Sequence, residues 1–207
     1  MRVLLDEVEC NTNAASVAQA VAAGATLAEQ QGRLIVEVVV DGESWTEERL
    51  NRDSTTQVAD EVRLTSADPK ELVCQTFEEA AEALLDADRL QQSAAELMQA
   101  DQIAQGMNQL NEAFSIWLSV QQAVVMGTQV AGIDFEQSLA NSPAAAGQSI
   151  SANIEHLNQQ LRAVRDALEN RDTIALADLL LYDLPDVVLQ WRALLQDLQR
   201  DVRGEGG

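Results

Sequence analysis

The sequence predicts an α+β protein, with a small N-terminal β-α-β-β unit (residues 1–67), a mostly antiparallel four-helix bundle (residues 68–203) and a disordered tail (residues 204–207). Two patterns predict this fold class. In the last two-thirds of the chain, four stretches place apolar residues alternately three and four positions apart. This spacing puts an apolar stripe along one side of a helix, which partner helices must cover. Near the N-terminus, alternating apolar residues flank an Asp-Gly pair, which is typical of a β-hairpin.

The composition allows a sizeable core and argues against some partners. Of the 207 residues, 46% are hydrophobic but only 3% are aromatic, so aliphatic side chains must fill the interior. The formal net charge is −21 and is spread along the chain, with 13 acidic and 5 basic side chains in residues 1–68 and 21 and 8 in residues 69–207. Such a charge favours solubility and repels nucleic acid and anionic lipid. We therefore expect no nucleic-acid partner.

The sequence predicts a cytoplasmic protein that does not bind a membrane. Its apolar runs stay short of the roughly 18–20 residues needed to span a bilayer. Acidic residues at Asp6 and Glu7 come too early for a secretory signal peptide. In a reducing compartment, Cys10 and Cys74 are expected to be small buried hydrophobic side chains rather than a disulfide.

A strand, a helix and a second strand are expected at the start of the chain. Residues 2–10 form the first strand and residues 14–31 the helix, which Gly32 ends. Gly24 lies on the apolar face of this helix, where glycine costs about 1 kcal/mol relative to alanine unless a close contact requires it. Residues 34–40 form the clearest strand, with the even-numbered side chains on one face.

A hairpin and a last strand complete the expected N-terminal unit. Asp41-Gly42 is a strong hairpin-turn signal, and residues 43–45 can form the return strand. Residues 46–57 are expected to form a loop with one short helical turn, and residues 58–64 alternate again as a strand. In a β-α-β-β order, the first two strands should pair in parallel through a right-handed crossover.

The first two helices of the expected bundle have recognisable ends. Asp68 suits the N-cap and Pro69 the first position of the first helix. Asp101 can cap the second helix, which should end near Gly127 or Gly132.

The third and fourth helices follow one long loop, which is expected at residues 133–149. The third helix covers residues 150–169, and the short connection at residues 170–172 makes the last two helices antiparallel neighbours. Asp172 or Thr173 can cap the fourth helix. Pro185 falls inside that helix, but the apolar stripe keeps its phase across it, so we expect a kink rather than a break.

The sequence does not contain the residue patterns of the common catalytic and metal sites. His156 is the only histidine, which argues against histidine-based zinc sites and against the Glu-x-x-His pairs of di-iron bundles. The glycine-rich signatures of nucleotide binding and the Gly-x-Ser-x-Gly signature of hydrolases do not occur. Five carboxylates on one helix are interpreted as a solvated face: Glu78, Glu79, Glu82, Asp86 and Asp88. We therefore expect no catalytic residue, no metal and no cofactor.

Two of the expected helices are apolar over a wider arc than one exposed face requires. The surplus side chains on the second and fourth helices are Ile116, Val120, Met126, Val130, Leu180, Val187 and Leu194. Either both helices are central and covered by their neighbours, or the surplus forms a groove that binds a partner helix or a second copy of the chain. These seven residues are the candidate partner-binding residues.

Residues 66–198 resemble the flagellin-type export chaperones, small cytoplasmic all-helical proteins that hold a terminal segment of a secreted subunit. The similarity lies in Ser66-Ala67-Asp68-Pro69-Lys70-Glu71-Leu72, in the hairpin from Asn153-Ile154 and Leu157 to Arg171-Asp172, and in Ala175-Leu176 and Trp191. The chain departs from that family in three ways: it lacks the tyrosine-containing N-terminal segment, it has Phe77-Glu78-Glu79 where a Tyr-Asp pair is usual, and it carries the β-α-β-β unit. The resemblance implies a helical fold and a protein partner, but no partner-binding residue is carried over by position.

The surplus apolar side chains, with no catalytic constellation beside them, favour a non-enzymatic cytoplasmic protein-interaction module. Such an adaptor or chaperone would bind a partner protein through an apolar helical surface. One alternative is a structural homo-oligomer, for instance a homodimer, that buries the same surface between copies. A second alternative is a small-ligand binder or enzyme that uses carboxylates where the bundle meets the sheet.

Overall fold

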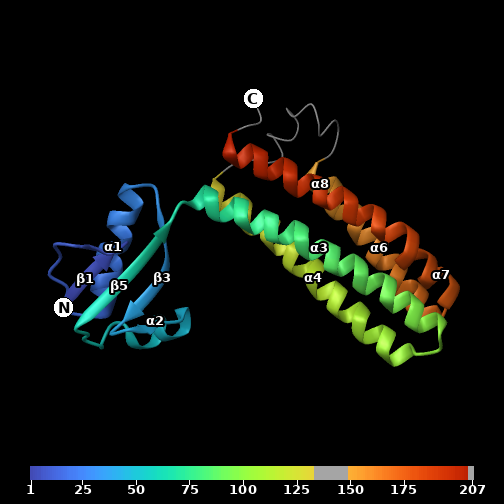
Figure 1. Ribbon diagram of the computed structural model, residues 1–207, viewed down its shortest axis with the longest axis horizontal. Helices are drawn as coiled ribbons and strands as arrows, with labels where there is room; N and C mark the ends of the chain where they lie inside the picture. The colour runs from blue at the N-terminus through green and yellow to red at the C-terminus, as the bar shows by residue number, and fades with distance from the viewer. Residues whose placement is uncertain (133–148, 205–207) are drawn as a thin grey trace. The chain divides into compact units, whose positions relative to one another are not determined.

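The computed structural model, drawn in Figure 1, describes residues 1–132 and 149–204. It has the mixed α+β class that the sequence predicts, with a five-stranded sheet in its N-terminal part and long helices after it. The chain divides into two compact units, Met1–Leu72 and Val73–Gly207, which we call the N-terminal unit and the helical unit. The loop expected at residues 133–149 lies outside the described residues except for Ser149, as does the expected tail except for Gly204.

The sheet of the N-terminal unit has the strand order β2-β1-β5-β3-β4. Its strands are β1 (Arg2–Leu5), β2 (Val8–Glu9), β3 (Leu34–Val40), β4 (Glu43–Ser44) and β5 (Glu61–Ala67). β5 is central, because it pairs in parallel with β1 and antiparallel with β3. The parallel pairing predicted for the first two strands is therefore wrong: β5 lies between β1 and β3, which run in opposite directions.

A tight turn inside the first expected strand accounts for this error. Asp6 and Glu7 both have positive φ, 49° and 64°, and the chain reverses there to pair β2 antiparallel with β1. The single strand predicted at residues 2–10 is thus a hairpin. Positive φ is uncommon for residues other than glycine, and the Asp6 carboxylate is held in this turn by hydrogen bonds from Ser66.

Helix α1 (Val17–Gln30) packs on the sheet and shares a core with β1, β3 and β5. Ser16 caps it by accepting a hydrogen bond from the backbone N–H of Gln19. Gly24 faces β5, and a Cβ atom at this position would overlap the side chain of Leu64. The close contact that explains an interior glycine is therefore present.

The second half of the sheet follows the sequence signals in part, since the strand expected at residues 58–64 is β5, which begins three residues later at Glu61 and ends at Ala67. β3 has the predicted bounds, but a bulge between Ile35 and Glu37 shifts its phase, so the even-numbered side chains do not all share the buried face. Asp41 and Gly42 both have positive φ, 50° and 85°, and form the predicted hairpin turn to β4. Helix α2 (Glu47–Asp53) is longer than the expected single turn and starts at the Thr46 N-cap.

The helical unit is built from α3 (Pro69–Gln99), whose first residues belong to the N-terminal unit, α4 (Ile103–Ala131) and α6 (Ile150–Asn170), followed by a final helix in three segments. These segments are α7 (Thr173–Asp178), the π-helical η1 (Leu179–Asp183) and α8 (Leu184–Arg203). In Figure 1, α3, α4, α6 and α8 run alongside one another. Side chains from all four contribute to one apolar core.

Most ends of the long helices lie where the sequence places them. The Asp68 carboxylate accepts a hydrogen bond from the N–H of Lys70 at 2.8 Å, which confirms the predicted cap of α3. The prediction that Asp101 caps α4 is wrong, because Asp101 has a φ of 61° and reverses the chain, while Gln102 is the N-cap. Gly132, with a φ of 62°, ends α4.

The final helix is interrupted just before Pro185. Proline has no N–H to donate to the carbonyl four residues earlier, so the regular hydrogen-bond ladder cannot continue through it. The chain responds with one wide π-helical turn, in which the N–H of Leu184 donates to the carbonyl of Leu179. Leu180 and Leu184 are both fully buried, so the apolar stripe continues across this turn.

Candidate functional site

The seven candidate partner-binding residues do not form one surface. Four of them are buried side chains with at most 2% exposure: Val120, Leu180, Val187 and Leu194. A fifth, Ile116, packs half-buried against the same core as three of them. The four buried residues are therefore core residues, because neighbouring helices cover the wide apolar arcs of α4 and the final helix. Only Met126 (62% exposed) and Val130 (42% exposed) reach the surface, and both lie on α4.

The outer side of α4 is nearly free of charge and carries exposed apolar side chains among uncharged polar ones such as Gln122 and Gln129. Its exposed apolar side chains are Leu118, Val125, Met126 and Val130, which we call the α4 face. At 100° per residue they lie opposite the buried stripe that contains Trp117 and Val124. Among the 29 residues of α4, Glu112 carries the one charged side chain, although the whole chain carries a net charge of −21. Leu118 and Val125 were not among the residues predicted from the sequence, although the low charge of this helix is a property of the sequence itself.

The acidic part of α3 lies at the same level as the α4 face. Gly127 of α4 packs on Phe77 of α3, because a Cβ atom at Gly127 would lie 2.6 Å from the phenyl ring. Ten residues earlier on α4, the indole N–H of Trp117 donates to the side-chain oxygen of Gln91 on α3 at 3.1 Å. The stretch of α3 between these two contacts exposes four carboxylates: Glu78, Glu79, Glu82 and Asp86.

A buried aromatic pair supports α4 from inside. Trp117 and Trp191 meet edge to face, with ring centroids 5.8 Å apart and an interplanar angle of 84°. Gln91, which is fully buried, holds the Trp117 indole by its hydrogen bond. Sequence reasoning did not single out Gln91, since a glutamine on an amphipathic helix gives no signal of burial. Leu118 directly follows Trp117, so the first residue of the α4 face is next to a residue of the core.

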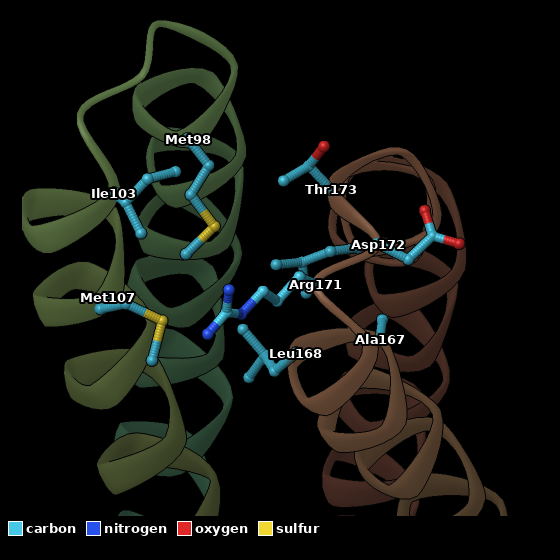
Figure 2. Close-up of a pocket in the computed structure, with 9 residues that line it drawn as sticks. Met98, Ile103, Met107, Ala167, Leu168, Arg171, Asp172 and Thr173 are labelled. Carbon is cyan, nitrogen blue, oxygen red and sulfur yellow. The ribbon is translucent and has the colours of Figure 1, made fainter.

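A separate cavity of about 330 Å³ opens between the α3–α4 connection and the α6–α7 connection (Figure 2). Its lining residues are Met98, Ile103, Met107, Ala167, Leu168, Arg171, Asp172, Thr173 and Leu176. Met98, Ala167 and Leu176 are buried, so the cavity has an apolar floor. These residues come from two connections far apart in the sequence, and none was a candidate from the sequence alone.

Arg171 supplies the positive charge of this cavity. Its φ of 56° at the C-cap of α6 turns the backbone. In Figure 2 its side chain extends between the two helical hairpins, α3–α4 and α6–α7, toward Met107 and Leu168. Nine of the twelve arginines form ion pairs with carboxylates. Within the described residues Arg171 forms none. The neighbouring Asp172 carboxylate points away from the cavity (Figure 2) and accepts a hydrogen bond from the N–H of Ala175 at 3.0 Å.

The other candidate groups lack a recognisable chemistry. A depression of about 550 Å³ beside α6 and α7 is lined in part by four aspartates: Asp166, Asp172, Asp178 and Asp183. Across residues 1–132 and 149–204, however, no group of three or more His, Cys, Asp or Glu side chains is arranged to hold a metal ion. His156 contacts Gln190 of α8 at 3.1 Å and so connects α6 to α8. Cys10 is half-buried and Cys74 is buried, and the two are not joined by a disulfide.

Comparison with known proteins identifies one family. The family described as Domain of unknown function (DUF8042) matches residues 74–194, which is more than half of the chain and lies within the helical unit. No curated protein and no solved structure matches the chain. Among the helices that the structure describes, none combines the length and the apolar character needed to cross a membrane.

Proposed function

The chain belongs to the DUF8042 family, and we propose that it is a non-enzymatic protein-interaction module of the cytoplasm, an adaptor or chaperone. In this proposal the helical unit is a mostly antiparallel four-helix bundle, and its α4 face binds an amphipathic helix of a partner protein. One observation carries the proposal: four exposed apolar side chains lie together on a long helix with a single charged residue, in a strongly acidic protein.

Composition distinguishes the α4 face from ordinary surface. Single exposed apolar residues are normal on soluble proteins, and Ile174 and Leu189 elsewhere in the helical unit are of that kind. Centres of protein interfaces are instead depleted in charge and enriched in methionine and other adaptable apolar side chains. The α4 face has both properties, with Met126 among its four side chains.

Charge indicates what kind of helix would bind. Glu78, Glu79 and Glu82 on α3 lie at the same level as the α4 face, and the net charge of −21 attracts cations over longer distances. A second copy of the chain would bring the same negative charge, so self-association is disfavoured. The best-matched partner is a helix with an apolar stripe flanked by lysine and arginine.

The resemblance of residues 66–198 to flagellin-type export chaperones supports the same class of partner. Those proteins hold a terminal segment of another polypeptide, as the α4 face is proposed to do.

The proposal can be tested with the full chain and a designed helical peptide. The peptide carries leucine at i, i+3, i+4 and i+7 and lysine at the flanking positions, and its binding is measured by fluorescence anisotropy. Leu118→Glu and Met126→Glu should each weaken binding by about tenfold or more, because each places a charge inside the contact. Added salt should also weaken binding, and a peptide with glutamate in place of lysine should not bind.

Leu189→Glu is the matched control, because Leu189 on α8 is 61% exposed and Leu118 is 62% exposed. This variant should bind the peptide as the wild type does. If Leu118→Glu binds the peptide as tightly as Leu189→Glu does, only general electrostatics attract the cationic peptide and the proposal is wrong. A dimer whose mass by light scattering does not change with concentration would instead support the homo-oligomer alternative.

A further inference from the structure

We propose that the cavity between the α3–α4 and α6–α7 connections binds a medium-chain aliphatic carboxylate. The alkyl chain would lie among Met98, Met107 and Leu176, and the carboxylate would pair with Arg171. This site is separate from the α4 face, and it does not depend on the function proposed above.

The lining and the size of the cavity fit an alkyl chain. Met98, Ala167 and Leu176 are buried, and Met107 and Leu168 are partly buried, so a ligand here contacts mainly hydrocarbon and thioether groups. Flexible methionine side chains adapt to a linear chain more readily than branched residues do. A water molecule in the liquid occupies about 30 Å³, and a small group such as a methylene is of similar size. A cavity of about 330 Å³ therefore has space for roughly ten to twelve non-hydrogen atoms. Octanoate, with ten, matches this size.

The charge in the cavity selects the head group. Arg171 reaches into the space between the two hairpins (Figure 2), and no described carboxylate forms an ion pair with it, whereas most arginines of the chain are paired. A planar guanidinium binds a carboxylate through two parallel hydrogen bonds. The acidic neighbour Asp172 is engaged by Ala175 and points away, so it does not compete for Arg171.

The four methionines of the chain provide a direct readout of where such a ligand binds. With ¹³C-methyl-labelled methionine, octanoate should shift the signals of Met98 and Met107 in a saturable way. The signals of Met1 and Met126 should stay unchanged, because neither lines the cavity. 1-Octanol, which has the same chain without the charge, should shift the same two signals at higher concentration.

Two variants test the head group and the tail separately. Arg171→Gln should weaken octanoate binding by about tenfold and leave 1-octanol binding unchanged, because it removes only the charge. Arg203→Gln is the control, since Arg203 is exposed at the end of α8 and lies outside the cavity. Ala167→Leu should weaken the binding of both ligands by filling the space.

Three results would overturn the proposal: unmoved Met98 and Met107 signals at millimolar octanoate, an equal loss of octanoate and 1-octanol binding in Arg171→Gln, or shifts confined to Met126. The last result would place octanoate on the α4 face. Peptide binding to the α4 face is measured on other variants, so either proposal can fail while the other stands.

Discussion

The carboxylate of Asp6 accepts two hydrogen bonds from Ser66, one from the backbone N–H at 2.7 Å and one from the hydroxyl at 2.6 Å. The same hydroxyl accepts a hydrogen bond from Nε of Arg33 at 2.7 Å, and Arg33 also donates to the Ser66 carbonyl. These contacts join the β1–β2 turn to β5 and to the residue before β3. The hydrogen bonds from Ser66, helped by the charge of Arg33, lower the pKa of Asp6 below its usual range.

This arrangement makes the N-terminal unit sensitive to acid. Because the pKa of Asp6 is lower in the folded than in the unfolded chain, the carboxylate contributes stability above about pH 4. That contribution is lost as the pH falls through the lower, folded-state pKa. Asp6→Asn should reduce the free energy of unfolding at pH 7 by about 1 kcal/mol, a modest value because the side chain is 37% exposed. It should also flatten the loss of stability below pH 4 in urea unfolding curves.

Glu7→Gln is the control for this prediction. Glu7 is the second turn residue, and its ion pair with Arg63 at 3.5 Å is exposed to solvent, so its loss should change stability by less than about 0.5 kcal/mol. An acid dependence in Asp6→Asn equal to that of the wild type would contradict the assignment.

The two leucines at the centre of α6 should differ in their contribution to stability. The heptad-like spacing predicts both as core residues, but Leu157 is fully buried while Leu161 is only partly buried against the same cluster. Leu157→Ala should therefore cost about 2–5 kcal/mol of unfolding free energy, and Leu161→Ala about 1–2 kcal/mol. Chemical denaturation of both variants checks the ranking, and equal costs would mean that the phase of α6 is wrong.

The contact between Gly127 and Phe77 leaves no space for a methyl group. Alanine favours a helix by about 1 kcal/mol over glycine, but here its Cβ would lie 2.6 Å from the buried phenyl ring. Gly127→Ala should therefore destabilise the chain by about 1 kcal/mol or more. In a Phe77→Leu background the same substitution should cost less, and strictly additive effects in this double-mutant cycle would exclude the steric explanation.

Asp68 should stabilise the start of α3 through its side chain. Its carboxylate accepts a hydrogen bond from the N–H of Lys70 at 2.8 Å, so Asp68→Ala should cost about 0.5–2 kcal/mol. Asp68→Asn keeps an acceptor oxygen and should cost less. An unchanged denaturation midpoint in Asp68→Ala would show that this hydrogen bond does not contribute.

Features that depend on a few neighbouring residues could be predicted from the sequence. Asp68-Pro69 at the start of α3, Asp41-Gly42 in the hairpin and Gly132 at the end of α4 act through their own backbone geometry and hydrogen bonds. Asp101 is the exception among the helix ends. An aspartate can cap a helix with its side chain or reverse the chain with a positive φ, and local sequence does not distinguish the two uses.

The candidate site depended on packing between distant segments, so the sequence predicted it only in part. Of the apolar surplus, Met126 and Val130 are exposed, but Val120, Leu180, Val187 and Leu194 are buried by the neighbouring helices. The cavity lined by Met98, Met107 and Arg171 could not be foreseen from the sequence, because two connections that are far apart in the chain form it.

The sequence by itself determined the α+β class, most ends of the long helices and the low charge of α4, since each is a property of residues close together in the chain. Tertiary structure alone decided that β5 lies between β1 and β3, that four surplus side chains are core and that Arg171 reaches over an apolar cavity. The physical reason is that burial and strand pairing are set by which distant surfaces meet, and a one-dimensional pattern specifies the surfaces but not their partners.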